Sequence, residues 1–391
     1  MSAAAHPGTL EDALHEQASA QAGGRSDFGD DRYLQGLRTF LHALTEDYGL
    51  EGDVLRAAAE QPVTKSLVGR LYAFDGFGRR PEYAQAAIDR PLFIIGLGRT
   101  GTTALHQLLA LDEQFQGLQS WLVQTPMVRP PRDQWASIPE HEQAVAAAEA
   151  VRDELSAMHW VSADDYDEDQ QVIGHTFFSN RFGSQRSPLP TYDDWLLGQD
   201  LTPSFRYLRD VLALVGLDSP PRTWLLKNPS HILTPDALLG AFPDARVVVT
   251  HRDPVKSIPS VASLIWTTRQ RTARYGSVRL GTAEGVGRRE MRFWTHALDR
   301  YMKVSAERPD AFLDVWQHDL HADPLAVVQR IYERFGLELS PQAEGRMREW
   351  AAEQGGRDAG GHRYTAEEFG LTDREIAETY ATYRERYGFA A

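Results

Sequence analysis

The sequence predicts an α/β fold in which helices flank an open, mostly parallel sheet, with a helical segment before the sheet and helical insertions within it. Short apolar runs of strand character alternate along the chain with segments of helical period, and the first run ends in a glycine-rich turn. Repeated strand-then-helix units are typical of parallel sheets covered by helices on both faces. Hydrophobic residues make up 42% of the 391 residues and charged residues 25%, the balance of a folded globular protein.

The N-terminal part of the chain is expected to differ from the rest. Residues 1–25 are rich in Ala, Gly and Ser, a composition that predicts a flexible tail. Residues 26–388 are expected to form a single domain, which begins with a helical segment at residues 26–90. The apolar residues that recur there at helical spacing include Leu34, Leu37, Phe40, Leu41 and Leu44.

The sheet core is expected in residues 91–260 and 305–340. Four apolar runs predict strands at residues 92–95, 223–227, 246–250 and 312–316. The segments that follow these runs predict helices at residues 102–111, 234–241, 255–266 and 324–335. Pro324 opens the last of these helices, at a position where its missing N–H costs nothing.

Two insertions interrupt the core. Residues 112–220 are expected to be helical, notably at 140–159 and 192–217, and residues 267–302 form the second insertion. Residues 341–388 are expected to hold a C-terminal loop and a last helix at 372–387. Insertions that follow strand ends commonly build the substrate pockets of α/β enzymes.

The composition excludes several classes of function. The chain has no cysteine, which excludes thiolate-bound metal sites, and its 13 histidines include no His-Glu-x-x-His pair, so a zinc hydrolase has no support. The acidic segment 164–169 lacks the glycine of a calcium loop, which favours a solvated acidic turn. A net charge of −14 argues against nucleic acid as a partner. No apolar run approaches the ~20 residues of a membrane span and no signal pattern opens the chain, which predicts a cytoplasmic protein without a membrane span.

The glycine-rich turn is the strongest local signal. It joins a predicted strand to a predicted helix, and its candidate binding residues are Gly98, Arg99, Thr100, Gly101, Thr102 and Thr103. Such turns direct backbone N–H groups toward a phosphate, and the helix N-terminus adds partial positive charge. The spacing from Gly96 to Gly101 is P-loop-like, but Thr102 stands where a P-loop has its Lys. That difference argues against ordinary ATP or GTP hydrolysis, and Arg99 would supply the missing charge.

Two further candidate segments follow predicted strands. Arg252, together with Ser260 on the next helix, could grip one phosphate, although Arg252 could instead pair with Asp253. Lys227 could neutralise charge on a leaving group, and a surface salt bridge is the alternative. His231 could be a general base or a capping or core residue.

Together these motifs resemble the sulfotransferases that use 3′-phosphoadenosine-5′-phosphosulfate (PAPS), and look closest to the large bacterial branch related to tyrosylprotein sulfotransferases. The resemblance covers roughly residues 30 to 388. In that family the segment seen here as Arg99 to Thr103 binds the 5′-phosphosulfate, and the pair seen here as Arg252 and Ser260 binds the 3′-phosphate. The Lys of a Lys-x-Pro motif, here Lys227, assists the transfer. The resemblance therefore implies PAPS as co-substrate, 3′,5′-bisphosphoadenosine as product, and no metal.

The implied reaction is in-line transfer of a sulfuryl group to a hydroxyl or amine. Arg99, Lys227 and the N–H groups of the loop would stabilise the leaving phosphate. Relatives often carry a Trp-Glu pair whose Glu is a candidate base, but the second residue of the pair is here Leu122. We therefore expect His231 to be the base to test first and His175 the second. Arg363 is expected either to close over the cofactor or to have a structural role.

The acceptor is not defined by the sequence, and neither is the oligomeric state. Aromatic residues in the insertions allow a small-molecule, lipid or glycoside acceptor of lipophilic or aromatic character. Two other functions stay open at this stage. One is a P-loop-like small-molecule kinase, which the missing Lys disfavours. The other is a catalytically impaired nucleotide-binding homologue that has lost its base.

Overall fold

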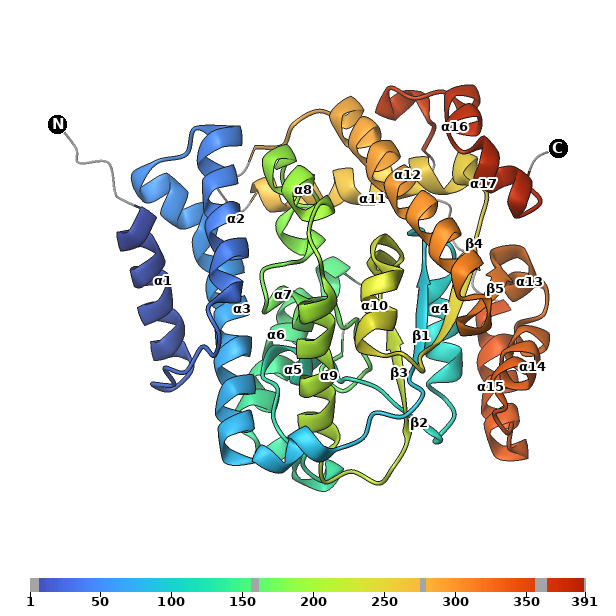
Figure 1. Ribbon diagram of the computed structural model, residues 1–391, viewed down its shortest axis with the longest axis horizontal. Coiled ribbons are helices and arrows are strands. Elements are labelled where there is room, and N and C mark those ends of the chain that lie inside the picture. Colours follow the sequence, from blue (N-terminus) through green and yellow to red (C-terminus); the bar gives the residue numbers. More distant parts are fainter. Residues whose placement is uncertain (1–6, 156–161, 275–278, 356–363, 390–391) are drawn as a thin grey trace.

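A parallel sheet lies in the right half of the view in Figure 1, which shows the computed structural model; the structure describes residues 7–155, 162–274, 279–355 and 364–389. Five strands pair in the order β2-β3-β1-β4-β5. Their bounds are β1 (Leu92–Gly96), β2 (Phe115–Gln116), β3 (Thr223–Lys227), β4 (Arg246–His251) and β5 (Phe312–Trp316). The predicted fold class is confirmed, and of these strands only the two-residue β2 was not predicted from the sequence.

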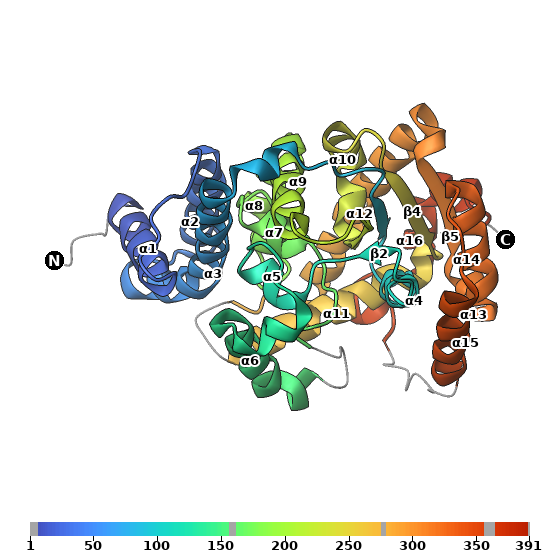
Figure 2. The same ribbon diagram turned by 90° about the horizontal axis from the view of Figure 1, so that it is seen from below.

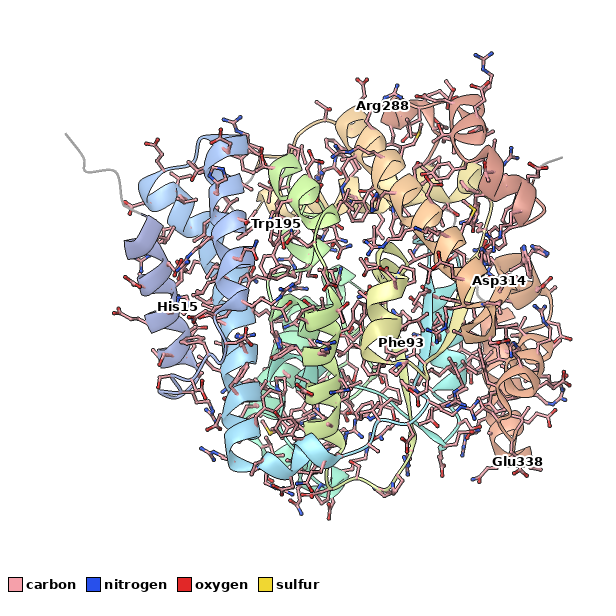
Figure 3. The ribbon with its side chains drawn as sticks, viewed as in Figure 1. His15, Phe93, Trp195, Arg288, Asp314 and Glu338 are labelled. Atoms are coloured by element: carbon pink, nitrogen blue, oxygen red, sulfur yellow. The ribbon has the colours of Figure 1, made fainter. Side chains whose placement is uncertain are left out.

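The central strand β1 is buried on both faces, which explains its continuous apolar run. Phe93, which Figure 3 shows in the interior of the molecule, and Ile95 pack into one hydrophobic cluster, whereas Leu92 and Ile94 pack into another. Successive side chains of a strand point to opposite faces, so the two clusters lie on the two sides of the sheet. The helices that contribute to the Leu92 side include α4 (Thr102–Leu109), α14 (Pro324–Phe335) and α15 (Pro341–Gly355). Those on the Phe93 side include α9 (Thr202–Gly216), α10 (Pro235–Ala241), α11 (Pro254–Arg274) and α12 (Ala283–Glu307).

The N-terminal helices form one end of the molecule, away from the sheet (Figure 2). They are α1 (Pro7–Gln21), α2 (Arg32–Tyr48) and α3 (Gly52–Arg79), followed by the short η1 (Pro81–Gln85). The flexible tail predicted for residues 1–25 is therefore wrong from residue 7 onward. Leu10, Leu14 and Ala18 recur every four residues and are buried along one side of α1, which packs on α3. The ring of His15 on α1 also hydrogen-bonds the hydroxyl of Tyr33 at 2.7 Å.

The first insertion is helical, as predicted. Its elements before α9 are α5 (Ser120–Gln124), η2 (Arg132–Ser137), α6 (Pro139–Leu155), α7 (Gln170–Gly174), η3 (Asn180–Phe182) and α8 (Pro190–Leu197). The single helix predicted at 192–217 is two helices, α8 and α9, because Gly198 ends the first and Pro203 lies in the first turn of the second. The helix predicted at 140–159 reaches Leu155, and its last predicted residues lie outside the described ones.

The remaining elements complete the core and the C-terminal part. They are η4 (Pro229–Leu233), η5 (Pro309–Ala311), α13 (Gln317–Ala322), η6 (Glu367–Phe369), α16 (Asp373–Thr379) and α17 (Ala381–Arg386). The predicted last helix is thus divided into α16 and α17. In the part of the chain that the structure describes, no helix has the length and apolar character to cross a membrane.

The topology brings three strand ends together. β1 is hydrogen-bonded to β3 on one side and to β4 on the other, and all three run parallel. Their carboxyl ends therefore meet at one edge of the sheet, at the point where the chain changes from one side of β1 to the other. In open α/β sheets this edge is where ligands bind.

Candidate functional site

The loop between β1 and α4 has a fixed shape. Gly101 has a φ of +96°, which a side chain would strain, and a β-carbon added to Gly96 would lie 2.6 Å from Thr250 Oγ1. Thr100 is completely buried, and its hydroxyl donates to the Leu97 carbonyl at 2.6 Å and shares a hydrogen bond of 2.6 Å with the Thr250 hydroxyl. The loop is thus tied to β4, and the Thr100 side chain acts on the loop itself.

The N-terminus of α4 begins directly after this loop. Gly101 precedes the helix, and no side chain caps its first turn. The first N–H groups of a helix have no partner within the helix and carry partial positive charge. An oxyanion seated on the loop would therefore find unpaired donors at Thr102 and Thr103.

Arg99 lies at the exposed tip of the loop. Its φ of +69° is unusual for a residue other than glycine and costs about 1 kcal/mol or more. The Arg99 carbonyl accepts a hydrogen bond from Arg252 Nη1 at 3.2 Å. The predicted residues Arg99 and Arg252, which are 153 positions apart, are therefore neighbours.

Lys227 connects the loop helix to the acidic segment 164–169. It ends β3 and its side chain is only 6% exposed. Its Nζ lies 3.5 Å from Thr103 Oγ1 and 2.5 Å from Glu168 Oε1. Burial and the Lys227 charge lower the pKa of His106, on α4, to about 3, so this imidazole is neutral and a weak base.

The acidic segment is not simply a solvated turn, contrary to the sequence-based expectation. Glu168 pairs with Lys227, and Asp169 is completely buried. Asp169 Oδ1 lies 2.8 Å from His231 Nε2, although the contact is too poorly aligned to be a hydrogen bond. A sequence signal existed, because two adjacent acidic residues directly precede the buried helix α7. It did not indicate which side chains these two residues face.

His231 is buried in the core and its ring faces Asp169. The ring lies 4.8 Å from the ring of Phe205 and 5.9 Å from that of Phe93. A small cavity beside His231, with Asn180 and Asn228 in its wall, has room for only about one or two water molecules. This cavity is too narrow for an acceptor, and the position of His231 favours a structural role over that of a base.

Arg252 and Ser260 lie after β4, as predicted. Arg252 follows the strand and is partly buried, and Ser260 is 5% exposed in the second turn of α11. The alternative partner considered for Arg252 is taken by another residue, because Arg384 Nε donates to Asp253 Oδ1 at 3.1 Å. Arg252 is therefore turned toward the loop, through the Arg99 carbonyl, and not toward Asp253.

Three other predicted or considered residues lie elsewhere. His175 is buried against Gly69 and Tyr207, and burial with the nearby Arg70 and Arg181 charges lowers its pKa to about 3. It packs between helices away from the loop and is not suited to accept the proton. Leu122 is completely buried among apolar residues, and Arg363 lies outside the described residues.

The fold and the site together define a class of protein. A tight glycine-containing loop follows the central strand of a parallel sheet, a buried Lys ends the neighbouring strand, and an Arg follows the strand on the other side. This arrangement suits a transferase whose substrate carries two anionic groups. Among the described residues, no group of three or more acidic or histidine side chains could hold a metal ion.

Comparisons with known proteins identify the family. A model of the sulfotransferase family matches residues 91–341. The chain is 25% identical to omega-hydroxy-beta-dihydromenaquinone-9 sulfotransferase Stf3 of Mycobacterium bovis over 326 residues, 80% of this chain and 78% of the relative. The crystal structure of sulfotransferase STF1 from Mycobacterium tuberculosis matches with a TM-score of 0.84 and 35% identity, covering 95% of this chain and 98% of the other. Sulfotransferase STF9 from Mycobacterium avium matches with a TM-score of 0.83 and 26% identity over 96% of both chains.

The chain belongs to the sulfotransferase family. The family predicted from the motifs is confirmed, and the protein is a transferase enzyme.

Proposed function

We propose that this sulfotransferase transfers the sulfuryl group of PAPS to the hydroxyl group of a lipophilic small molecule, with Glu168 as the general base. The observation that carries the proposal is the placement of Lys227 between the loop helix and Glu168. A cation for the leaving group and a carboxylate for the incoming hydroxyl thus lie side by side at the phosphate-binding loop.

Two anion grips support PAPS as the donor. The loop from Gly98 to Thr103 and the α4 N-terminus suit the phosphosulfate, because they offer N–H donors and Lys227. Arg252 and Ser260 suit the 3′-phosphate. The hydrogen bond from Arg252 to the Arg99 carbonyl keeps this second anion-binding site next to the loop. The chain concentrates this positive charge despite a net charge of −14.

The chemical step uses groups that are already adjacent. The acceptor hydroxyl loses its proton to the Glu168 carboxylate as its oxygen bonds to sulfur. The bond between sulfur and the bridging oxygen breaks, and that oxygen leaves on 3′,5′-bisphosphoadenosine with the electron pair. Lys227, Arg99 and the loop N–H groups stabilise the charge that develops there, and one such donor is typically worth about 3 kcal/mol.

Glu168 has a second role before substrate binds. Lys227 is nearly buried, and an unpaired buried ammonium is costly, so the carboxylate neutralises it in the free enzyme. When the phosphosulfate provides a new partner for Lys227, Glu168 becomes available to the acceptor. This exchange couples donor binding to the availability of the base.

The relatives guide the choice of acceptor. The Stf3 relative is named for a menaquinone-derived lipid alcohol. We therefore propose a lipophilic alcohol as the acceptor of this protein as well. The kinase alternative loses its basis with the family assignment, and Glu168 supplies the carboxylate whose absence suggested an inactive homologue.

A single assay tests the proposal. The purified protein is incubated with ³⁵S-labelled PAPS and a panel of lipophilic alcohols, and in parallel with labelled ATP. Sulfated product together with an equal amount of 3′,5′-bisphosphoadenosine is expected with PAPS only. Tight binding of 3′,5′-bisphosphoadenosine without transfer to any alcohol, or phosphorylation by ATP, would refute the proposal.

A further inference from the structure

A group of three cations next to the acidic segment has no counterpart in the functions assigned so far. Lys65 lies on α3, Arg181 in η3 and Arg186 in the loop that follows. Each is partly buried, and none of their side chains makes a hydrogen bond or ion pair with another residue in the described part of the chain. We call them the cationic recess.

The elements that carry these cations meet at Gly174. A β-carbon added there would lie 3.3 Å from Arg181 Cδ and 3.9 Å from Ser66 Oγ, so η3 and α3 both contact the end of α7. The charges also act on one another. Burial, followed by the charges of Arg181 and Arg186, lowers the pKa of Lys65 to about 8. Burial and the Arg186 charge lower the pKa of Arg181 to about 10, against a smaller opposite effect of Asp167.

Other buried arginines in this chain are compensated. Arg289 pairs with Asp193 and Glu290, Arg70 donates to the carbonyls of Phe28 and Asp30, and Arg269 donates to the carbonyl of Ser184. This pattern is expected, because burying a charge without a partner is costly. The three cations of the cationic recess lack such partners, although the net charge of the protein is −14. Their lack of partners points to a negatively charged group from outside the chain.

The recess adjoins the reaction site. Asp167, whose charge acts on Lys65 and Arg181, directly precedes Glu168. The loop between Arg181 and Arg186 also lies against α11, because Arg269 Nε donates to the Ser184 carbonyl at 3.1 Å. Arg269 is nine residues after Ser260 on this helix, a distance of about 13 Å along its axis. Figure 2 shows α11 running from the sheet toward α6.

We propose that Lys65, Arg181 and Arg186 bind an anionic group of the acceptor, a carboxylate or a phosphate or sulfate ester, at the end of the molecule remote from its reacting hydroxyl. This inference rests on the proposed function and narrows it to acceptors that are both lipophilic and anionic. The donor occupies the loop grip and the Arg252 grip, so the recess would act on the acceptor alone.

Paired acceptors test the proposal. Sulfation of ω-hydroxyalkanoates of graded length is compared with that of their methyl esters at saturating PAPS, with wild-type protein, Arg181→Gln and Arg186→Gln. The carboxylates should exceed the esters about tenfold in kcat/KM in the wild type, the effect of one charge-assisted contact, and this preference should disappear in both variants. Arg206→Gln, which removes an exposed charge on α9, should keep the preference, and no variant should change the affinity for 3′,5′-bisphosphoadenosine.

A second measurement does not depend on transfer. The donor site is first saturated with 3′,5′-bisphosphoadenosine. The Tm of the wild type should then be higher in sodium sulfate than in sodium chloride of equal ionic strength. This increase in Tm should be smaller for Arg181→Gln and for Arg186→Gln. A sulfate-dependent increase in Tm would support anion binding by the cationic recess even if no acceptor of the panel is sulfated. The lack of sulfated product would then count only against the proposed class of acceptor. If sulfate has no such effect and no acceptor is sulfated, the recess proposal fails.

Two further results would overturn the proposal. Equal kcat/KM values of the wild type for carboxylates and for their methyl esters would show that the enzyme does not recognise the charge of the acceptor, even if free sulfate binds. A preference that survives in both variants would place the anion elsewhere. A merely structural role of Arg181 predicts a lower Tm for Arg181→Gln without anions, whereas mutual repulsion among the three cations predicts an unchanged or higher one.

Discussion

Replacing Glu168 by Gln tests the assignment of the base most directly. The change keeps the size of the side chain and its ability to accept a hydrogen bond from Lys227, which lies 2.5 Å away, but removes the negative charge and the proton acceptor. A positioned general base contributes about 10²- to 10⁴-fold to a rate. The kcat of Glu168→Gln should therefore fall by that factor, equivalent to about 3–5 kcal/mol in the barrier.

The same substitution should affect stability in a defined way. Lys227 is 6% exposed, and Glu168 is its only carboxylate partner among the described residues. Removing one partner of a fully buried pair costs about 3–5 kcal/mol, but Glu168 is 32% exposed, so we expect about 1–3 kcal/mol for the free enzyme. Saturating 3′,5′-bisphosphoadenosine should narrow this difference, because its phosphate gives Lys227 a new partner.

The assay combines kinetics with urea unfolding. Initial rates of sulfate transfer give kcat and the KM for PAPS, and unfolding curves with and without 3′,5′-bisphosphoadenosine give the stability. Asp165→Asn, which neutralises an exposed carboxylate in the same acidic segment, serves as the control and should stay within about twofold of the wild type. A kcat of Glu168→Gln within threefold of the wild type would refute the assignment.

Three other predictions concern the donor grip, pH dependence and the N-terminal helix. Arg252→Ala should weaken binding of 3′,5′-bisphosphoadenosine about 10- to 150-fold in calorimetry, the cost of one charge-assisted contact, whereas Lys256→Ala, which removes an exposed charge in the first turn of α11, should not. His175 has a pKa of about 3 in the folded protein and about 6.5 when unfolded, so below pH 6.5 the unfolded chain gains a proton that the folded one excludes. As the pH is lowered from about 6.5 toward 3, the free energy of unfolding should fall by up to ~1.4 kcal/mol per pH unit because of His175. His175→Gln should fall less steeply over this range; equal pH slopes for the wild type and the variant would contradict the assignment to His175. Leu14→Ala should cost about 2–5 kcal/mol in urea unfolding and Val54→Ala, on an exposed surface, less than ~0.5 kcal/mol; equal small effects would mean that α1 is not part of the core.

Much of the fold, and the placement of the loop, Lys227 and Arg252 at one edge of the sheet, could be predicted because their signals are local. The apolar run of β1, the glycine-rich loop and the first turn of α4 are contiguous, and each has its own sequence pattern. Lys227 and Arg252 were assigned to the same edge because parallel strands bring their carboxyl ends together. The hydrogen bond from Arg252 to the Arg99 carbonyl agrees with that reasoning.

Other features escaped prediction for identifiable physical reasons. Glu168 and Lys227 are 59 positions apart, and nothing in an acidic run distinguishes a carboxylate in water from one beside a buried ammonium. β2 has two residues, too few for any periodicity. In α1 the composition of Ala, Ser and Gly concealed a stripe of Leu10, Leu14 and Ala18, because small residues also allow close packing of helices.

His231 shows why the two acidic residues must be separated experimentally. The adjacent carboxylates face different partners: Glu168 contacts Lys227, and Asp169 contacts His231 in the core. His231 Nε2 lies 2.8 Å from Asp169 Oδ1 in the core, so His231 helps to place Asp169 and the chain next to Glu168. Substituting His231 would therefore disturb the placement of Glu168 and reduce activity, although Glu168 and not His231 is the proposed base. Loss of activity alone cannot identify the base; a fall in kcat with donor affinity retained or raised is the result expected for Glu168→Gln.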